Sequence, residues 1–124
     1  MASRLHDYVD AWRRHDMPGV LSTLTEDCAV IKSYGPVYRG RERVEQWMRA
    51  WFAAGGSVDA WDITSYSDAG DVLVAEWRFN CTWQGKATTF EGATIARLRG
   101  DKIAYLREYA TTAPLYDWTG HWRD

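Results

Sequence analysis

The sequence is poor in the residues that define several classes of protein. It has only two cysteines and three prolines among 124 residues. Cys28 and Cys81 lie in apolar stretches without the CxxC or Cys/His spacing of a metal site, so both are expected to be reduced core residues and no metal is predicted. The low proline content, together with 46% hydrophobic residues, excludes a disordered or collagen-like chain.

An excess of positive charge and long apolar runs are also lacking. Fifteen Lys and Arg residues against seventeen Asp and Glu residues give a net charge of -2, which disfavours a nucleic-acid partner because no basic field is present to hold phosphates. The apolar runs are only a few residues long, and residues 1–15 are charged throughout. Neither a membrane span nor a secretory signal is therefore recognised, and we expect a cytoplasmic protein with no membrane partner.

Aromatic side chains, in contrast, are abundant. Eight Trp, seven Tyr and three Phe make up 15% of the chain, and such large rings either fill a core or line a cavity. A core of this size has difficulty burying so many rings without voids. Some of them are therefore expected to form a pocket wall, and the candidates are Trp12, Trp47, Trp51, Trp61, Trp77 and Trp83.

The first half of the chain has the pattern of three helices and one short strand. Apolar residues at helical spacing predict a first helix that ends near residues 14–15. Asp16 is a suitable N-cap for a second, short helix that follows at once. Residues 28–33 are typical of a strand, and a third helix is expected from Gly40 to the glycine pair at 55–56.

After residue 57 the apolar pattern alternates instead of following a helical period. Turn signals divide this half into four expected strands, over residues 58–67, 72–84, 87–99 and 102–112. Successive hairpins make them an antiparallel meander. Because the helices precede the sheet, the predicted fold class is α+β.

Alternation within the strands assigns the two faces of this sheet. In the second strand, the face expected to pack on the helices holds Trp77, Phe79, Cys81 and Trp83. On the last two strands, the expected outer face mixes arginines with the apolar residues Ile95, Ile103, Tyr105 and Tyr109. Such a mixture is typical of an interface, so a homodimer through the outer, convex face is expected.

Four segments carry a resemblance to a known fold. They are YVDAWRRHD at 8–16, LTEDCAV at 24–30, YRGRERV at 38–44, and RGDKI at 99–103 running into LREY at 106–109. In this order of elements, residues 4 to about 113 resemble the superfamily of nuclear transport factor 2, ketosteroid isomerase, limonene epoxide hydrolase, scytalone dehydratase and the SnoaL-like polyketide cyclases. The resemblance implies a cone-shaped, curved antiparallel sheet wrapped over three N-terminal helices.

The same resemblance implies a single SnoaL-like domain over residues 1–124 with a pocket at the wide end of the cone. Residues 114–124 form an aromatic tail that is too apolar for a free terminus. The tail is therefore expected to cover either the mouth of the cone or a dimer interface.

This sequence retains only some of the functional residues of the related enzymes. Tyr8 occupies the place of the ketosteroid isomerase tyrosine that donates to an oxyanion, whereas Lys32 and Thr94 replace the two acidic residues of that enzyme. Glu108 keeps one carboxylate of the limonene epoxide hydrolase set. The other two members of that set are an Arg and an Asp, and Trp77 and Phe79 replace them in this sequence. The resemblance therefore implies the fold more specifically than it implies a reaction.

Each candidate has a catalytic and a structural interpretation. Glu108 has apolar neighbours that disfavour its charge, so it is either a proton donor and acceptor or the partner of an arginine such as Arg78 or Arg107. Lys32 either pairs with Glu108, acts as a base or Schiff-base amine, or extends to the open rim. Tyr8 either donates to a ligand oxygen or packs its ring in the core.

Two classes of function remain open at this point. The first is a small cofactor-independent enzyme that acts by proton transfer on an apolar cyclic or aromatic metabolite, as an isomerase, cyclase, dehydratase or hydrolase, with Glu108, Tyr8 and Lys32 as catalytic residues. The second is a non-catalytic module for small-molecule binding or dimerisation. For either class, the residues expected to bind the small molecule are Trp12, Trp47, Trp51, Trp77, Phe79 and Thr94.

Overall fold

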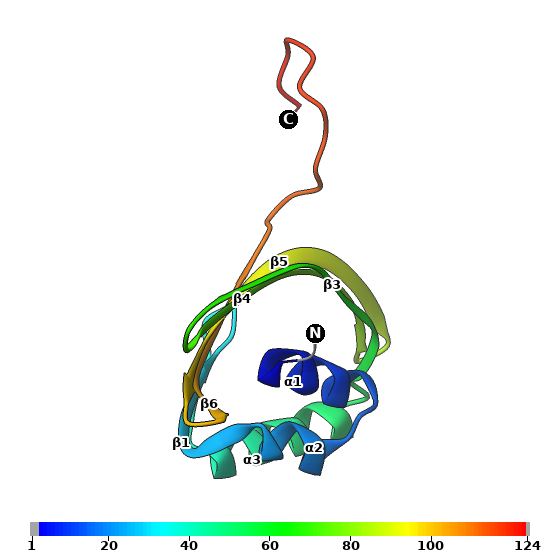
Figure 1. Cartoon of the computed structure of the whole chain (residues 1–124). Helices are drawn as coiled ribbons and strands as arrows, with labels where there is room; N and C mark the ends of the chain where they lie inside the picture. The colour runs from blue at the N-terminus through cyan, green and yellow to red at the C-terminus, as the bar shows by residue number, and fades with distance from the viewer. Residues whose placement is uncertain (1–2, 124) are drawn as a thin grey trace.

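A curved sheet wraps around helices in the computed structural model, which describes residues 3–123 (Figure 1). Helix α1 (Arg4–Arg13) lies inside the curve of the sheet, and helices α2 (Met17–Ser22) and α3 (Arg41–Ala53) close its open side. The helix boundaries agree with those expected from the sequence. The fold is the predicted α+β class.

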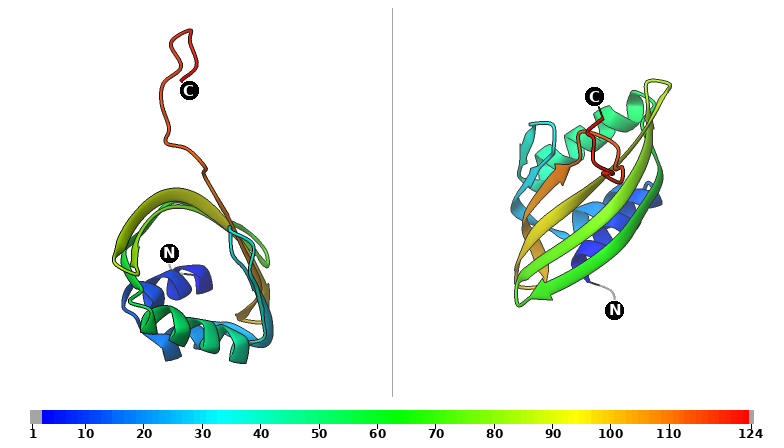
Figure 2. Two further views of the ribbon diagram at one scale, coloured as in Figure 1. Left: turned by 180° about the vertical axis from the view of Figure 1, so that it is seen from behind. Right: turned by 90° about the horizontal axis from the view of Figure 1, so that it is seen from above.

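The sheet has six strands in the spatial order β2-β1-β6-β5-β4-β3. Their bounds are β1 (Leu24–Ile31), β2 (Val37–Arg39), β3 (Ser57–Ala69), β4 (Val72–Trp83), β5 (Lys86–Arg99) and β6 (Lys102–Ala110). Strands β3 to β6 form the predicted antiparallel meander, visible from above in Figure 2. Strand β1 continues the sheet by pairing parallel with β6. Strand β2 was not predicted, because three residues are too few to show an alternating pattern.

Local signals set the ends of several elements. The Asp16 side chain caps α2 by accepting a hydrogen bond of 3.0 Å from the backbone N–H of Gly19. The tight hairpin between β4 and β5 places both Gln84 and Gly85 at positive φ, 51° and 78°. A two-residue turn of this kind matches the right-handed twist of the strands that it joins.

The faces of β4 follow the predicted alternation over most of its length. Trp77 is buried, with Phe79 and Cys81 half-buried on the same inner face, while Glu76 and Arg78 are exposed. The prediction was wrong for Trp83, which is 43% exposed. Residues 83–89 are all exposed, so the hairpin tip projects past the helices and offers this ring nothing to pack against.

Because β6 contains a bulge, the predicted assignment of its residues to the two faces is wrong at the start of the strand. Leu98 pairs with Ile103 but Arg97 pairs with Tyr105, so Ala104 is an extra residue without an opposite partner. The alternation reverses at this point, because a bulge changes which side the following residues face. Ile103 was predicted on the outer surface and instead is fully buried, at 0% exposure.

The tail after β6 extends away from the body of the protein (Figures 1 and 2). Leu115 and Trp122 are each 77% exposed. Leu115 lies beside Tyr109 and Thr111 on the outer side of the sheet, and the end of the tail folds back on itself, with the Trp118 and Trp122 rings 5.1 Å apart. The expectation that it covers the mouth of the cone is therefore wrong within this chain. Its role in a dimer interface stays a prediction.

Both cysteines are free, as expected. Cys28 is buried and Cys81 half-buried, and burial is the main cause that raises the pKa of each thiol above its ordinary value. Between residues 3 and 123, no helix is long and apolar enough to cross a membrane.

Gly92 in β5 is expected to tolerate no side chain. A Cβ placed there lies 2.3 Å from the carbonyl oxygen of Tyr109 and 2.5 Å from the ring of Trp77, so Gly92→Ala must displace a strand or a buried ring. We expect a loss of about 1–3 kcal/mol of stability, measured as a lower Tm. Thr89→Ala, at an exposed position of the same strand, is the control, with a change within roughly 0.5 kcal/mol. An unchanged Tm for Gly92→Ala would show that β5 and β6 do not pack this closely around the Trp77 ring.

Candidate functional site

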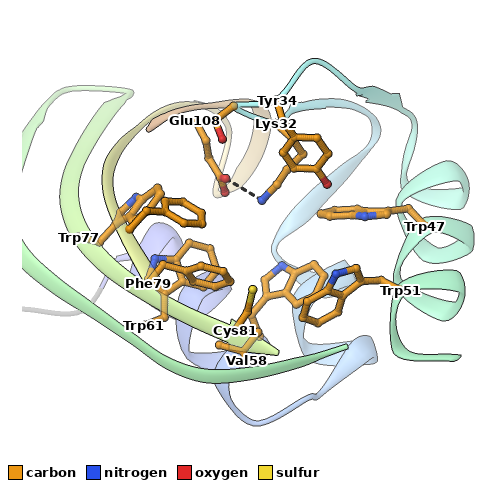
Figure 3. Close-up of a pocket in the computed structure, with 13 residues that line it drawn as sticks. Lys32, Tyr34, Trp47, Trp51, Val58, Trp61, Trp77, Phe79, Cys81 and Glu108 are labelled. Carbon is orange, nitrogen blue, oxygen red and sulfur yellow. Dashed lines mark hydrogen bonds and ion pairs between the residues drawn. The ribbon is translucent and has the colours of Figure 1, made fainter. Parts of the chain in front are cut away.

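A cavity of about 130 Å³ lies between the inner face of the sheet and helices α1 and α3. Most of its wall is aromatic and apolar, formed by Trp12, Trp47, Trp51, Val58, Trp61, Trp77, Phe79 and Phe90. Its remaining lining is Lys32, Ser33, Tyr34, Cys81 and Glu108. Five residues predicted to bind a small molecule, Trp12, Trp47, Trp51, Trp77 and Phe79, therefore lie together around one space (Figure 3).

The aromatic wall is held by ring-to-ring packing. The Trp61 ring lies edge to face against Trp77 at 5.7 Å and against Phe79 at 5.2 Å. On the helical side, Trp47 stacks on Tyr38 of β2 with a centroid distance of 4.3 Å. These arrangements are the ones that the aromatic quadrupole favours. The wall is thus a packed surface rather than a set of loose side chains.

The polar end of the cavity is an ion pair between neighbouring parallel strands. Strand β1 pairs with β6 in a register that places Ile31 opposite Arg107. The next residue on each strand, Lys32 and Glu108, therefore lie side by side, and the Lys32 Nζ donates a hydrogen bond of 2.6 Å to Glu108 Oε1 (Figure 3). Pairing of Lys32 with Glu108 was one of the predicted alternatives.

The two other partners considered for Glu108 are engaged elsewhere. Arg78 forms an ion pair of 3.7 Å with Glu91, and the Arg107 guanidinium lies 4.9 Å from the Tyr109 ring centroid on the outer face. An arginine partner for Glu108 is therefore wrong, because both arginines follow the alternation of their strands to the opposite face.

One oxygen of Glu108 is unsatisfied. The side chain is 4% exposed, and its Oε2 atom accepts no hydrogen bond from residues 3–123. A buried carboxylate oxygen without a donor is costly. It marks a place in the cavity where a donor or an acidic hydrogen of a bound molecule would be stabilised.

Lys32 lies inside the cavity and not at its rim. Its side chain is 15% exposed, and the ammonium group lies 5.4 Å from the centroid of the Trp47 ring. An ammonium has three donors, so the hydrogen bond to Glu108 leaves others for a ligand oxygen. The alternative in which Lys32 extends to solvent is wrong, because its carboxylate partner and the Trp47 ring hold it inward.

Tyr8 lies behind the cavity wall. It is 1% exposed, is absent from the lining, and packs edge to face against Trp12 and Trp61 at 6.4 and 6.2 Å. Burial, followed by the charge of Glu108, raises the pKa of Tyr8 well above its ordinary value. Its hydroxyl stays protonated and has no hydrogen-bond partner among the described residues. The geometry therefore gives it no direct access to a ligand.

Thr94 supports the wall without forming part of it. It is 1% exposed, and its hydroxyl accepts a hydrogen bond of 2.8 Å from the Trp77 indole N–H. Thr94, which was expected to contact the small molecule, does not line the cavity, whereas the Trp77 ring that it holds does.

Tyr34 is the lining residue that sequence reasoning missed. It belongs to the turn between β1 and β2, two residues after Lys32, and its hydroxyl points toward the space between Lys32 and Trp47 (Figure 3). Although the residue as a whole is 66% exposed, desolvation at the cavity and the nearby Tyr38 hydroxyl raise the pKa of Tyr34 above its ordinary value, so it is a protonated donor at neutral pH. Its nearness to Lys32 in a turn with Gly35 was the signal that could have identified it.

The family of the chain follows from its sequence. The model of the SnoaL-like domain matches residues 5–106. The chain belongs to the SnoaL-like domain family. No curated protein matches it.

Solved structures share the fold of this SnoaL-like domain. A protein of Catenulispora acidiphila DSM 44928 with a ketosteroid isomerase-like fold, in complex with trimethylamine, has a TM-score of 0.76 at 20% identity over 88% of this chain and 85% of that one. An LEH-like epoxide hydrolase of M. tuberculosis has a TM-score of 0.78 at 15% identity over 87% and 80%. A proposed polyketide cyclase of Pseudomonas putida KT2440 has a TM-score of 0.74 at 17% identity over 90% and 94%. These TM-scores establish the shared fold, as the resemblance predicted.

Within residues 3–123, no three His, Cys, Asp or Glu residues are grouped so that they could hold a metal ion.

The ion pair of this SnoaL-like domain predicts an unequal response to substitution. Lys32→Met leaves the Glu108 carboxylate buried without a counter-charge, whereas Glu108→Gln leaves an ammonium on a long side chain that can turn outward. We expect a loss of about 3–5 kcal/mol for Lys32→Met, a smaller loss for Glu108→Gln, and partial recovery in the double variant. Denaturant unfolding measures all three.

The exposed pair Glu45 and Arg49 on α3 is the matched control. Removing both of its charges is expected to change stability by less than about 1 kcal/mol. Strictly additive losses in the Lys32 and Glu108 double variant would contradict the coupling of the two charges.

Proposed function

We propose that this SnoaL-like domain is a small cofactor-independent enzyme that moves a proton on an apolar cyclic or aromatic carbonyl compound. The observation that carries the proposal is the unpartnered Glu108 Oε2 beside the Lys32 ammonium, in a cavity whose wall is otherwise aromatic. A base next to a cation is the arrangement needed to form an enolate, since one group takes the proton and the other stabilises the negative charge.

The proposed reaction uses each group once. Glu108 Oε2 takes a proton from the carbon next to the carbonyl, the electron pair of the broken C–H bond forms a C=C bond, and the C=O π pair moves onto the carbonyl oxygen. The enolate oxygen accepts a hydrogen bond from Lys32 Nζ. Glu108 then returns a proton either to the same carbon, which gives exchange, or to the far carbon of a C=C double bond conjugated with the enolate, which gives isomerisation; in both cases atoms and charges balance. Isomerases, cyclases and dehydratases share this first step.

The surroundings support this division of roles. The hydrogen bond of 2.6 Å from Lys32 holds Glu108 through Oε1, which leaves Oε2 to react. The Glu108 side chain is only 4% exposed, and charges interact more strongly when they are removed from water. Lys32 is assigned to the oxyanion instead of Tyr8, because Lys32 lines the cavity and Tyr8 does not.

A second candidate function is small-molecule binding without turnover. It is favoured by the extent of the aromatic wall, which leaves only about 130 Å³ of space. The Catenulispora acidiphila protein of the same fold was solved in complex with trimethylamine, which supports a small ligand in either case. The two functions differ in whether the bound molecule exchanges a hydrogen.

Hydrogen exchange at carbon tests the proposal. The protein is incubated in D₂O with a panel of cyclic ketones, and deuterium incorporation next to the carbonyl is followed by NMR. We expect wild-type protein to accelerate exchange and Glu108→Gln to reduce the rate on the order of 10² to 10⁴-fold while ligand binding is kept. Glu91→Gln, which changes an acid on the outer face of the sheet, is the control and should leave the rate unchanged.

The opposite result is equally clear. If ketones bind to the wild-type protein and no ketone exchanges faster than in buffer, the catalytic role of Glu108 is excluded. The binding function then accounts for the cavity.

A further inference from the structure

The size of the cavity limits what it can hold. Its volume of about 130 Å³ is close to that of apolar cavities of about 150 Å³ that hold one benzene molecule. The wall cannot easily withdraw, since Trp12 packs edge to face on Trp51 at 5.8 Å and Trp61 does the same on Phe79 at 5.2 Å. This volume matches one six-membered ring with a small substituent, and a second fused ring would have to extend beyond it.

The charges of the lining favour a neutral ligand. Lys32 and Glu108 cancel each other at 2.6 Å. The other titratable lining groups, Tyr34 and Cys81, both have a pKa raised by burial and stay uncharged at neutral pH. An anion would lie against the free Glu108 oxygen, and a cation against the Lys32 ammonium. Each would lose its hydration without a free counter-charge to replace it.

Two donors lie at the same end of the cavity, and the Tyr34 hydroxyl is also within reach of the Tyr38 hydroxyl. The Lys32 ammonium and the Tyr34 hydroxyl lie at the polar end, with the Glu108 carboxylate beside Lys32 (Figure 3). An acceptor oxygen bound by Lys32 lies next to the carboxylate that Lys32 contacts, so the adjacent carbon can approach the unpartnered Glu108 Oε2. A ketone offers this combination, because its oxygen accepts two hydrogen bonds and the hydrogen on its neighbouring carbon is acidic.

We propose that the site is specific for neutral single-ring ketones, whose carbonyl oxygen is held by both Lys32 and the Tyr34 hydroxyl. This inference rests on the proposed function and narrows it to a substrate class. It also gives Tyr34 the ligand-oxygen contact that the sequence suggested for Tyr8. Since Tyr34 is 66% exposed on a turn, its substitution leaves the core intact.

Binding measurements test this class independently of turnover. The probes are cyclohexanone, the two-ring ketone 2-decalone, the anion cyclohexanecarboxylate and the cation cyclohexylammonium, each titrated into wild-type protein at neutral pH. Binding is followed by NMR and by tryptophan fluorescence. We expect cyclohexanone to bind at least about tenfold more tightly than each of the other three, a difference that corresponds to about 1.4 kcal/mol.

A matched pair of variants tests the role of Tyr34. Tyr34→Phe is expected to weaken cyclohexanone binding by roughly 2- to 10-fold, the effect of one hydrogen bond, while binding of benzene, which has no oxygen, is kept. Tyr105→Phe is the control, because the Tyr105 ring lies outside the cavity with Arg97 5.6 Å from its centroid. It should bind cyclohexanone like the wild type.

Three outcomes would overturn the inference. They are equal or tighter binding of the two-ring ketone or of a charged probe, no binding of cyclohexanone, and cyclohexanone affinity unchanged in Tyr34→Phe. The deuterium experiment is read separately. Selective ketone binding without exchange would refute the proposed enzyme and keep the ligand class, whereas exchange on larger ketones would keep the enzyme and refute the class.

Discussion

The parallel pairing of β1 with β6 is the constraint on which the site depends. It places Val30 opposite Leu106 in the core and, at the next inward position of each strand, Lys32 beside Glu108. Two charges at such low exposure are stable only as a pair, because each alone would lose its hydration without compensation. A shift of this register by one residue would both expose the apolar side chains and separate Lys32 from Glu108. The fold and the polar end of the cavity are therefore determined by the same contacts.

The aromatic wall and the ion pair have complementary effects. Rings packed edge to face keep water away from Glu108 and Lys32, and this strengthens every electrostatic interaction between them and a bound molecule. The same rings reduce the free volume, so that chemistry and size selection come from one set of side chains. Thr94 and Tyr8 belong to the layer behind them, where Thr94 fixes the Trp77 indole.

The elements that depend on interactions between residues close in sequence were predicted from local sequence patterns. Helical spacing, the Asp16 cap and strict alternation in β4 gave the helices, the meander and most of the aromatic wall. The bulge at Ala104 and the layer of Tyr8 were not predictable in this way, since both depend on packing between distant elements. Lys32 and Glu108 are 76 residues apart, and the resemblance to known enzymes aligned both with functional positions without showing that they touch. Tyr34 was missed because a turn residue carries no periodic signal.

Strand β6 serves two parts of the molecule at once. It carries Glu108 on its inner face and continues directly into the protruding tail. At the junction, the Thr111 N–H donates a hydrogen bond of 2.9 Å to the carbonyl oxygen of Glu91 on β5. A force applied to the tail therefore reaches this hydrogen bond through the backbone, and Thr111 is only three residues from Glu108. The exposed tail and the Glu108 carboxylate thus belong to one continuous stretch of backbone, so anchoring of the tail would act on the strand that positions Glu108.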